Sequence, residues 1–157
     1  MISSQATKYV NVSPPVAIID NAAAVTTVVD TLGYDYCTFV CIYGATDIAT
    51  VALKIQESNG TSSATALDGS AADVTGLVSG TSTNIAGSTS SLPSSSADNT
   101  LYVFEIDLKA RKRYLDLVAT LGDGSAGTYF SAIAILSRAE QPGTTAASRG
   151  AAEILRA

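Results

Sequence analysis

The stretch 101–138 constrains the fold more than any other part of this sequence, because its apolar residues recur at every second position. In 101–108 and in 113–121 one alternating row is apolar, and in 128–137 both rows are largely apolar. Successive side chains of a β-strand point to opposite faces, so this period predicts three consecutive strands, the last covered on both faces. A helix through 108–119 is the alternative, but β-branched and aromatic content favours strands. We expect an antiparallel meander that carries the core.

Shorter runs before this stretch also have the composition of strands. Residues 36–43 are apolar on both rows and predict a central strand, whereas 50–57 alternates apolar with polar residues and predicts a half-exposed one. The remaining candidates are 8–12, 16–20 and 25–30. A count of about seven or eight strands with almost no helix predicts an all-β fold. We expect a single antiparallel β-sandwich, jelly-roll-like, with extended N- and C-terminal arms.

Both ends of the chain are expected to lie outside the sandwich. We assign 1–13 to an N-terminal arm, 14–138 to the β-sandwich domain and 139–157 to a C-terminal arm that begins near Pro142-Gly143. Few apolar anchors are present in the last segment, chiefly Ile154 and Leu155, so we expect both arms to become ordered only on a partner surface.

Residues 58–100 differ in character from the rest of the domain, because they contain no basic and no aromatic residue. A structureless loop of this length is uncommon inside a compact domain. Two interpretations stay open at this point: an excursion ordered by a partner, or a disordered linker.

Composition limits the function. The net charge of −5 argues against direct nucleic-acid binding. The sequence contains no run of about twenty apolar residues, so we expect no membrane span. The first residues lack the features of a secretory signal, so we expect synthesis and folding in a cytoplasm. Cys37 and Cys41 lie roughly 13 Å apart on one face of a strand, too far for a disulfide. Buried thiols are the favoured interpretation, with metal ligation or intersubunit bonds as alternatives.

No catalytic constellation stands out. The absence of histidine excludes Ser-His-Asp and Cys-His nucleophiles. Glu105 and Asp107 share a strand face at a glycosidase-like separation, but a solvated face is the favoured interpretation. The motif Gly122-x-Gly124-x-x-Gly127 is followed by a strand rather than a helix, so we expect a hairpin loop and no dinucleotide site.

Metal binding is equally weakly indicated. Asp68, Asp73 and Asp98 lie in the long polar segment without the regular spacing of a calcium loop. We therefore expect no enzyme activity, no cofactor and no metal.

Four of the nine basic residues fall within five positions, as Lys109, Arg111, Lys112 and Arg113. One interpretation is a solvated turn with salt bridges to Glu105, Asp107 or Asp116. The other is contact with an acidic patch on another protein. The candidate partner-binding residues are Lys109, Arg111, Lys112, Arg113, Ile154 and Leu155.

Two segments, 34–58 and 104–140, resemble small structural proteins encoded in the head modules of tailed bacteriophages. The second contains RKRYLDL at 111–117, followed by a GDG-type turn. This resemblance implies a virion component, most simply a capsid cement or decoration protein of jelly-roll type. It further implies a homotrimer at capsid three-fold sites, the major capsid protein as partner, assembly in the host bacterial cytoplasm and a final place on the capsid exterior.

Two alternatives remain at this stage. The first alternative is that the chain is a neck or tail component of the virion rather than a capsid protein. A carbohydrate-binding module for receptor recognition is the rival of another class. Tyr34, Tyr36 and Tyr43 are available for such a site, although tryptophan is absent.

Overall fold

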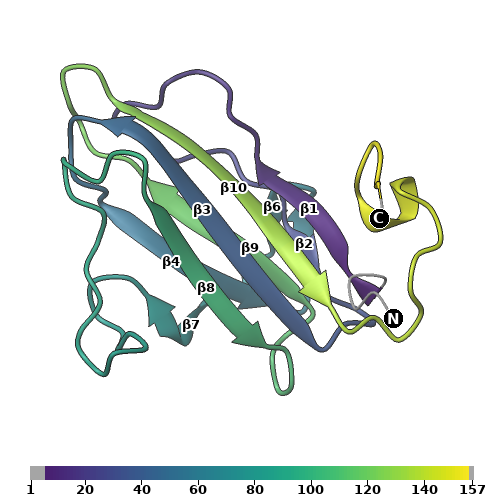
Figure 1. The fold of residues 1–157 in the computed structure, drawn as a ribbon. Coiled ribbons are helices and arrows are strands. Elements are labelled where there is room, and N and C mark those ends of the chain that lie inside the picture. The colour runs from purple at the N-terminus through teal and green to yellow at the C-terminus, as the bar shows by residue number, and fades with distance from the viewer. Residues whose placement is uncertain (1–5, 156–157) are drawn as a thin grey trace.

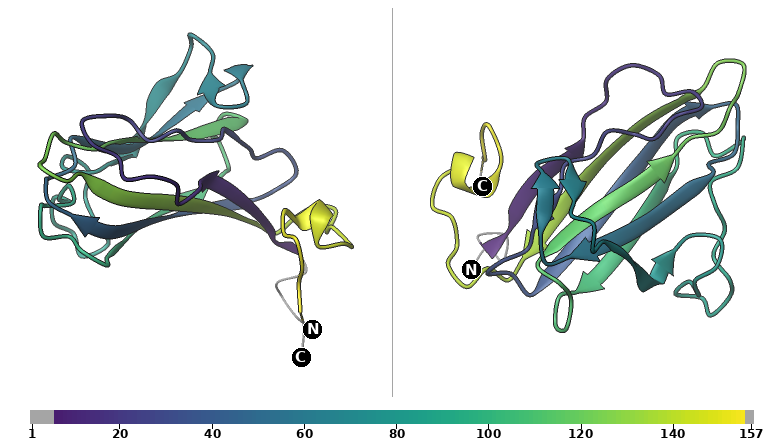
Figure 2. Two further views of the ribbon diagram at one scale, coloured as in Figure 1. Left: turned by 90° about the horizontal axis from the view of Figure 1, so that it is seen from above. Right: turned by 180° about the vertical axis from the view of Figure 1, so that it is seen from behind.

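Two four-stranded antiparallel sheets pack face to face in the computed structural model, which describes residues 6–155 (Figures 1 and 2). Sheet A has the order β1 (Lys8–Ser13), β10 (Thr128–Ser137), β3 (Tyr36–Thr46) and β8 (Leu101–Asp107). Sheet B has the order β2 (Val29–Asp30), β9 (Tyr114–Thr120), β4 (Ala52–Ser58) and β7 (Ala72–Val78). The further elements are the hairpin β5–β6 (Thr61–Ser63, Ala66–Leu67) and a 3₁₀ turn, η2 (Ala147–Arg149). The predicted all-β sandwich is confirmed.

The inner rows of both sheets form one apolar cluster. On β3 the row Cys37, Phe39, Cys41 and Tyr43 is buried, and Leu53, Ile55, Leu115 and Leu117 on sheet B belong to the same cluster. The ring of Tyr43 packs edge-on against Tyr102 and Phe130, with centroids 5.4 and 5.2 Å away. Its hydroxyl accepts a hydrogen bond from Thr50 Oγ1 at 3.2 Å, so the single polar atom of this side chain is satisfied inside the core.

The predicted meander is wrong, although its three strands exist. β8 pairs with β3, β9 lies in the other sheet between β2 and β4, and β10 lies between β1 and β3. The chain therefore crosses between the sheets after β8 and again after β9. Alternation reports which face a side chain occupies and carries no information about the neighbouring strand. The helix considered for 108–119 is absent, and Tyr114–Thr120 is a strand.

Other segments depart from expectation in detail. Of 25–30 only Val29–Asp30 is a strand, and 16–20 contributes a single bridge from Ile19 to Thr128. The stretch 58–100, interpreted from the sequence as either a partner-ordered excursion or a disordered linker, contains β5, β6 and β7, and Val74 of β7 is buried in the core. Strand pairing and burial within the chain therefore order part of this segment without a partner.

Lys8–Ser13, expected within the N-terminal arm, is an integral part of the sandwich. It pairs with β10 over its length and buries Val12 completely. The short edge strand expected at 8–12 is therefore present, and it extends to Ser13.

The thiols of Cys37 and Cys41 should resist modification in the folded protein. Both are fully buried and unpaired with each other, and burial raises the pKa of each thiol to about 12, well above the value for a free cysteine. At pH 8 that shift lowers the reactive thiolate fraction roughly a thousandfold. We expect negligible labelling by a thiol reagent under native conditions and complete labelling of both in guanidinium. Rapid native labelling of either cysteine would contradict the packing of β3.

Candidate functional interaction surface

The outer face of sheet A is apolar across three of its four strands, β8, β3 and β10. We call this surface the A-face, and it consists of Leu101, Val103, Val40, Ile42, Ile133 and Ile135. On these strands the outward rows alternate with the buried inner rows, so the same period that builds the core also builds the A-face.

The strand register makes the A-face contiguous. Ile42 lies opposite Leu101 on one side, and Val40 lies between Val103 and Ile133. Leu101 is 63% exposed and Val103 is 50% exposed. Directly opposed side chains on one sheet face lie about 4.5–5.5 Å apart, so these residues form one patch rather than scattered exposed side chains.

Sheet B presents a different outer face. Lys54 Nζ and Gln56 Nε2 both donate to the carboxylate of Asp73, at 2.8 and 2.7 Å. Thr26 Oγ1 donates to Asp116 Oδ1 at 2.9 Å, and burial raises the pKa of Asp116 despite that bond. Polar side chains therefore satisfy each other on sheet B. This difference makes the A-face a candidate surface for contact with another molecule.

A cleft of about 750 Å³ adjoins the A-face along β8. Its walls come from β8, from the end of β7 and from the loop 79–91. Leu77, Tyr102 and Phe104 line it together with several hydroxyl side chains, and Ile85 in the loop is fully exposed. Val103 belongs both to this cleft and to the A-face, so the two surfaces are continuous.

The basic cluster lies in the loop between β8 and β9, and most of its charge is paired within the chain. Arg113 donates to both carboxylate oxygens of Asp30, at 2.9 and 2.7 Å. Arg111 lies 3.6 Å from Glu57, which also accepts the Lys112 backbone N–H.

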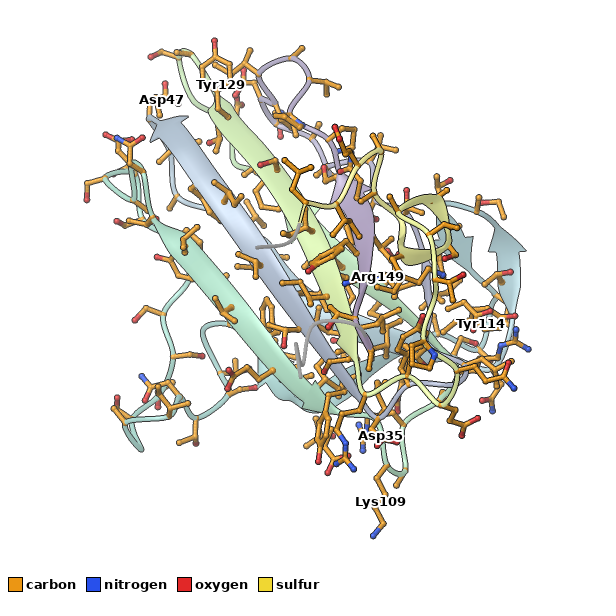
Figure 3. All side chains as sticks on the ribbon, turned by 45° about the vertical axis from the view of Figure 1, so that its right-hand side comes forward. Asp35, Asp47, Lys109, Tyr114, Tyr129 and Arg149 are labelled. Atoms are coloured by element: carbon orange, nitrogen blue, oxygen red, sulfur yellow. The ribbon has the colours of Figure 1, made fainter. Side chains whose placement is uncertain are left out.

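The partners of these basic side chains are thus not the expected Glu105, Asp107 or Asp116. Both true partners come from segments far away in the sequence, which is why inspection of neighbouring residues missed them. No ion pair involves the Lys109 side chain within the described residues, and Figure 3 shows it projecting from the tip of the loop.

The C-terminal segment is anchored by a residue that the sequence did not single out. Arg149 in η2 is 2% exposed, its Nε donates to the carbonyl of Thr7 at 2.8 Å, and its guanidinium lies 5.9 Å from the ring centre of Tyr9 (Figure 3). Gly150, at φ 76°, follows and lies against the carbonyl of Tyr9, where a side chain would collide.

The expected anchors of that segment contribute less. Ile154 is half-buried and Leu155 is 85% exposed. An isolated arginine among small polar residues gives no sequence signal of burial, since arginine is almost never fully buried unless paired.

The candidate catalytic and metal-binding carboxylates do not form a site. Glu105 and Asp107 are exposed on the border of sheet A. Asp98 accepts the backbone N–H of Thr46, and Asp68 accepts hydrogen bonds from Ser58 and Ser70. Within residues 6–155 no three potential ligands gather into a metal-binding group, and no helix there is long and apolar enough to cross a membrane.

The glycine-rich loop and the tyrosines also differ from their suggested roles. Gly122–Gly127 is not a hairpin, because it connects β9 in sheet B with β10 in sheet A, and Asp47 accepts the N–H groups of Ala126 and Gly127. Tyr43 is buried, Tyr34 is half-buried, and the partly exposed Tyr36 carries Arg138 at 5.6 Å from its ring centre. The three rings do not form a common platform for sugar.

These observations define the class of molecule as an antiparallel β-sandwich with one apolar outer face and a cleft beside it. Comparison of the chain with protein-family models, with curated proteins and with solved structures gave no match. The functional argument consequently depends on the geometry of these surfaces.

Replacing Arg149 with methionine should destabilise the folded chain, because the hydrogen bond from a charged donor to Thr7 is lost. Such bonds contribute about 1.5–3 kcal/mol, and we expect a decrease of that size in the free energy of unfolding measured with urea. Arg138→Met is the matched control. Its side chain is 68% exposed and pairs with Asp35 at 3.4 Å, so its loss should cost less than about 1 kcal/mol. Equal effects of both changes would refute the anchoring role of Arg149.

The Asp30–Arg113 pair should contribute a pH-dependent part of the stability. The hydrogen bonds from Arg113 lower the pKa of Asp30 below its usual value. A lowered folded-state pKa gives stability that is present above the unfolded pKa of about 3.9 and is lost as pH falls through the folded value. A double-mutant cycle with Asp30→Asn and Arg113→Met should give a coupling of about 0.2–1 kcal/mol at pH 7. That coupling should vanish in strong acid, and a coupling that persists there would contradict the assignment.

Proposed function

We propose that this protein is a non-enzymatic structural component of a tailed-bacteriophage virion. More specifically, we propose that it is a capsid cement protein that bridges subunits of the major capsid protein. It acts as a homotrimer on the capsid exterior, after assembly in the host bacterial cytoplasm, and requires no cofactor, metal, membrane or direct nucleic-acid contact.

The observation that carries the proposal is the contiguous apolar A-face on a rigid sandwich. Fully burying a leucine or isoleucine contributes about 1.5–3 kcal/mol, and the partly exposed Leu101 and Ile42 can each gain a part of that on contact. On a symmetric lattice the same modest contact repeats at every equivalent position, so many weak interfaces together hold neighbouring capsid subunits. The phage resemblance of 34–58 and 104–140 supports the same proposal, since those segments contain all of β3 and β10 and the second half of β8.

The strand orders support a jelly-roll topology within the sandwich. Leaving aside the small hairpin β5–β6, successive strands alternate between the sheets except where β4 is followed by β7 in sheet B. Two Greek keys folded into two four-stranded sheets produce this type of alternation.

A trimer requires two different surfaces of each subunit to meet, because a three-fold ring is built from heterologous contacts. The A-face borders the acidic residues Glu105 and Asp107 on β8, whereas Arg138 follows β10 on the other side of β3. Arg138 is already paired with Asp35 at 3.4 Å, so the acidic border on β8 is the more available charge for such a heterologous contact.

Placing glutamate at position 42 should weaken attachment to capsids. Ile42 is 40% exposed on β3, the middle strand of the A-face, so the change introduces a charge into the proposed interface and leaves the inner row intact. We expect at least a tenfold loss of affinity, about 1.4 kcal/mol, when purified protein is sedimented with particles of the encoding phage that lack it.

Ala52→Glu is the matched control, because it adds the same charge to the outward row of sheet B. It should bind as the wild type does. Equal binding of both variants, or a particle map with the A-face turned toward solvent, would refute the proposal. A map that places the protein only at the neck or tail would support that alternative position instead.

A further inference from the structure

The four sheet edges of this sandwich are not treated alike. At β1 the Arg149 guanidinium and Gly150 occupy the free edge, through contacts with Thr7 and Tyr9. β2 has only two residues, and Val28 beside it donates to Ala64 of the β5–β6 hairpin region. β7 carries an irregularity in its pairing with β4, with Gly76 at φ 88°. These three edges are covered, short or bulged, which are the usual protections against further strand pairing.

The edge of β8 has none of these protections. It is a seven-residue strand, Leu101–Asp107, without proline, lysine or an irregularity in its pairing with β3. It ends sheet A, and no strand among the described residues pairs with its other side.

Hydrogen bonds at both ends of β8 show which main-chain groups face outward. Tyr43 N–H donates to Thr100 O at 3.0 Å, and Leu108 N–H donates to Asp35 O at 2.9 Å. Even-numbered residues of this strand thus bond to β3, and the N–H and C=O groups of Val103 and Glu105 point away from the sheet. These groups form a template for one more strand.

The cleft described above lies on this same flank. It is lined by Val103 and Glu105 as well as by the inner-row side chains Tyr102 and Phe104, and Leu77 forms part of the opposite wall. A strand added to β8 would direct every second side chain into this cleft and the others onto the A-face.

We propose that the β8 edge binds an extended peptide segment of another protein, apolar at alternate positions and carrying a lysine or arginine opposite Glu105. The segment extends sheet A by one strand and fills the cleft between β8 and β7. Main-chain hydrogen bonds from Val103 and Glu105 supply affinity, and the cleft selects the apolar residues. This inference goes beyond the cement function and does not depend on it.

Charge decides between a foreign segment and a second copy of this chain. Glu105 is the only charged residue that lines the cleft, and Asp107 follows it on the same row. In an antiparallel pairing of two β8 strands, registers centred on Glu105 or Ile106 place carboxylates opposite each other, which is unfavourable. Registers centred on Val103 or Phe104 place Glu105 opposite Leu101 or Val103, so it gains no opposite charge in those either. A basic partner residue instead gains an ion pair there.

A peptide array tests the proposal on the full-length protein. The array contains eight-residue acetylated and amidated peptides in which valine, isoleucine or phenylalanine alternates with threonine, serine or lysine. We expect fluorescence anisotropy to show lysine-containing members that bind with a dissociation constant below about 1 mM, the weak end of specific affinity. Two further peptides carry backbone N-methyl groups, one at the odd-numbered and the other at the even-numbered residues of the best binder. Only one edge of the bound strand pairs with β8, so one of these two peptides should lose binding and the other should keep it.

Two variants assign the binding to β8. Val103→Pro removes the outward N–H at an edge position, where proline is tolerated, whereas Val103→Ile keeps it. We expect at least a tenfold loss for the proline variant and none for isoleucine. Glu105→Gln should weaken the lysine peptides selectively and does not alter the backbone.

Several results would overturn the inference. They are the absence of any binder in the array, equal binding by the two N-methylated peptides, or unchanged binding by Val103→Pro and Glu105→Gln together. If the proline variant fails to fold, as judged by its thermal transition, the N-methylated peptides and Glu105→Gln still decide. The peptide assay does not measure attachment to capsids. Failure of the cement proposal would therefore appear in the sedimentation experiment and not in this one.

Discussion

The inner row of β3 is the constraint on which the rest of this structure depends. Cys37, Phe39, Cys41 and Tyr43 are all buried, and β3 is paired on both sides, with β10 and with β8. Because the strand period is two, fixing this row inward leaves Thr38, Val40 and Ile42 directed outward. The same register therefore sets the core and the A-face, and neither can change without the other.

The strands were predictable from the sequence, whereas their partners were not. Alternation located β3, β8, β9 and β10 to within a few residues, because each has one row that must avoid water. The sandwich itself was predicted, but the placement of β9 in the sheet opposite β8 and β10 was missed, because the connections after β8 and β9 are long enough to cross the core and no two-residue turn fixes a hairpin there. The pairs Arg113–Asp30 and Arg149–Thr7 join residues more than eighty positions apart, which local patterns cannot report.

The apolar surface was partly visible in the sequence. Strands with both rows apolar, at 36–43 and 128–137, predicted cover on two faces. The chain covers only one face of β3 and β10, and the A-face is the other. The polar outer row of 50–57 was also predicted, but its partner was not: Lys54 and Gln56 both donate to Asp73 on the neighbouring strand β7. The A-face is a candidate interface because its outward side chains are apolar, whereas those of sheet B are polar and hydrogen-bonded to one another.

The unprotected β8 edge places a demand on the chain, because an exposed strand edge must not pair with the same edge of a second copy. Glu105 and Asp107 serve that demand, because they stand on the outward row of β8 at the border of the apolar patch. Any approach that brings two copies together edge to edge near these positions buries carboxylates beside each other or against apolar groups, and both arrangements cost free energy. A partner with a basic residue removes that cost. Two carboxylates can thus deter self-pairing and select a partner at the same edge.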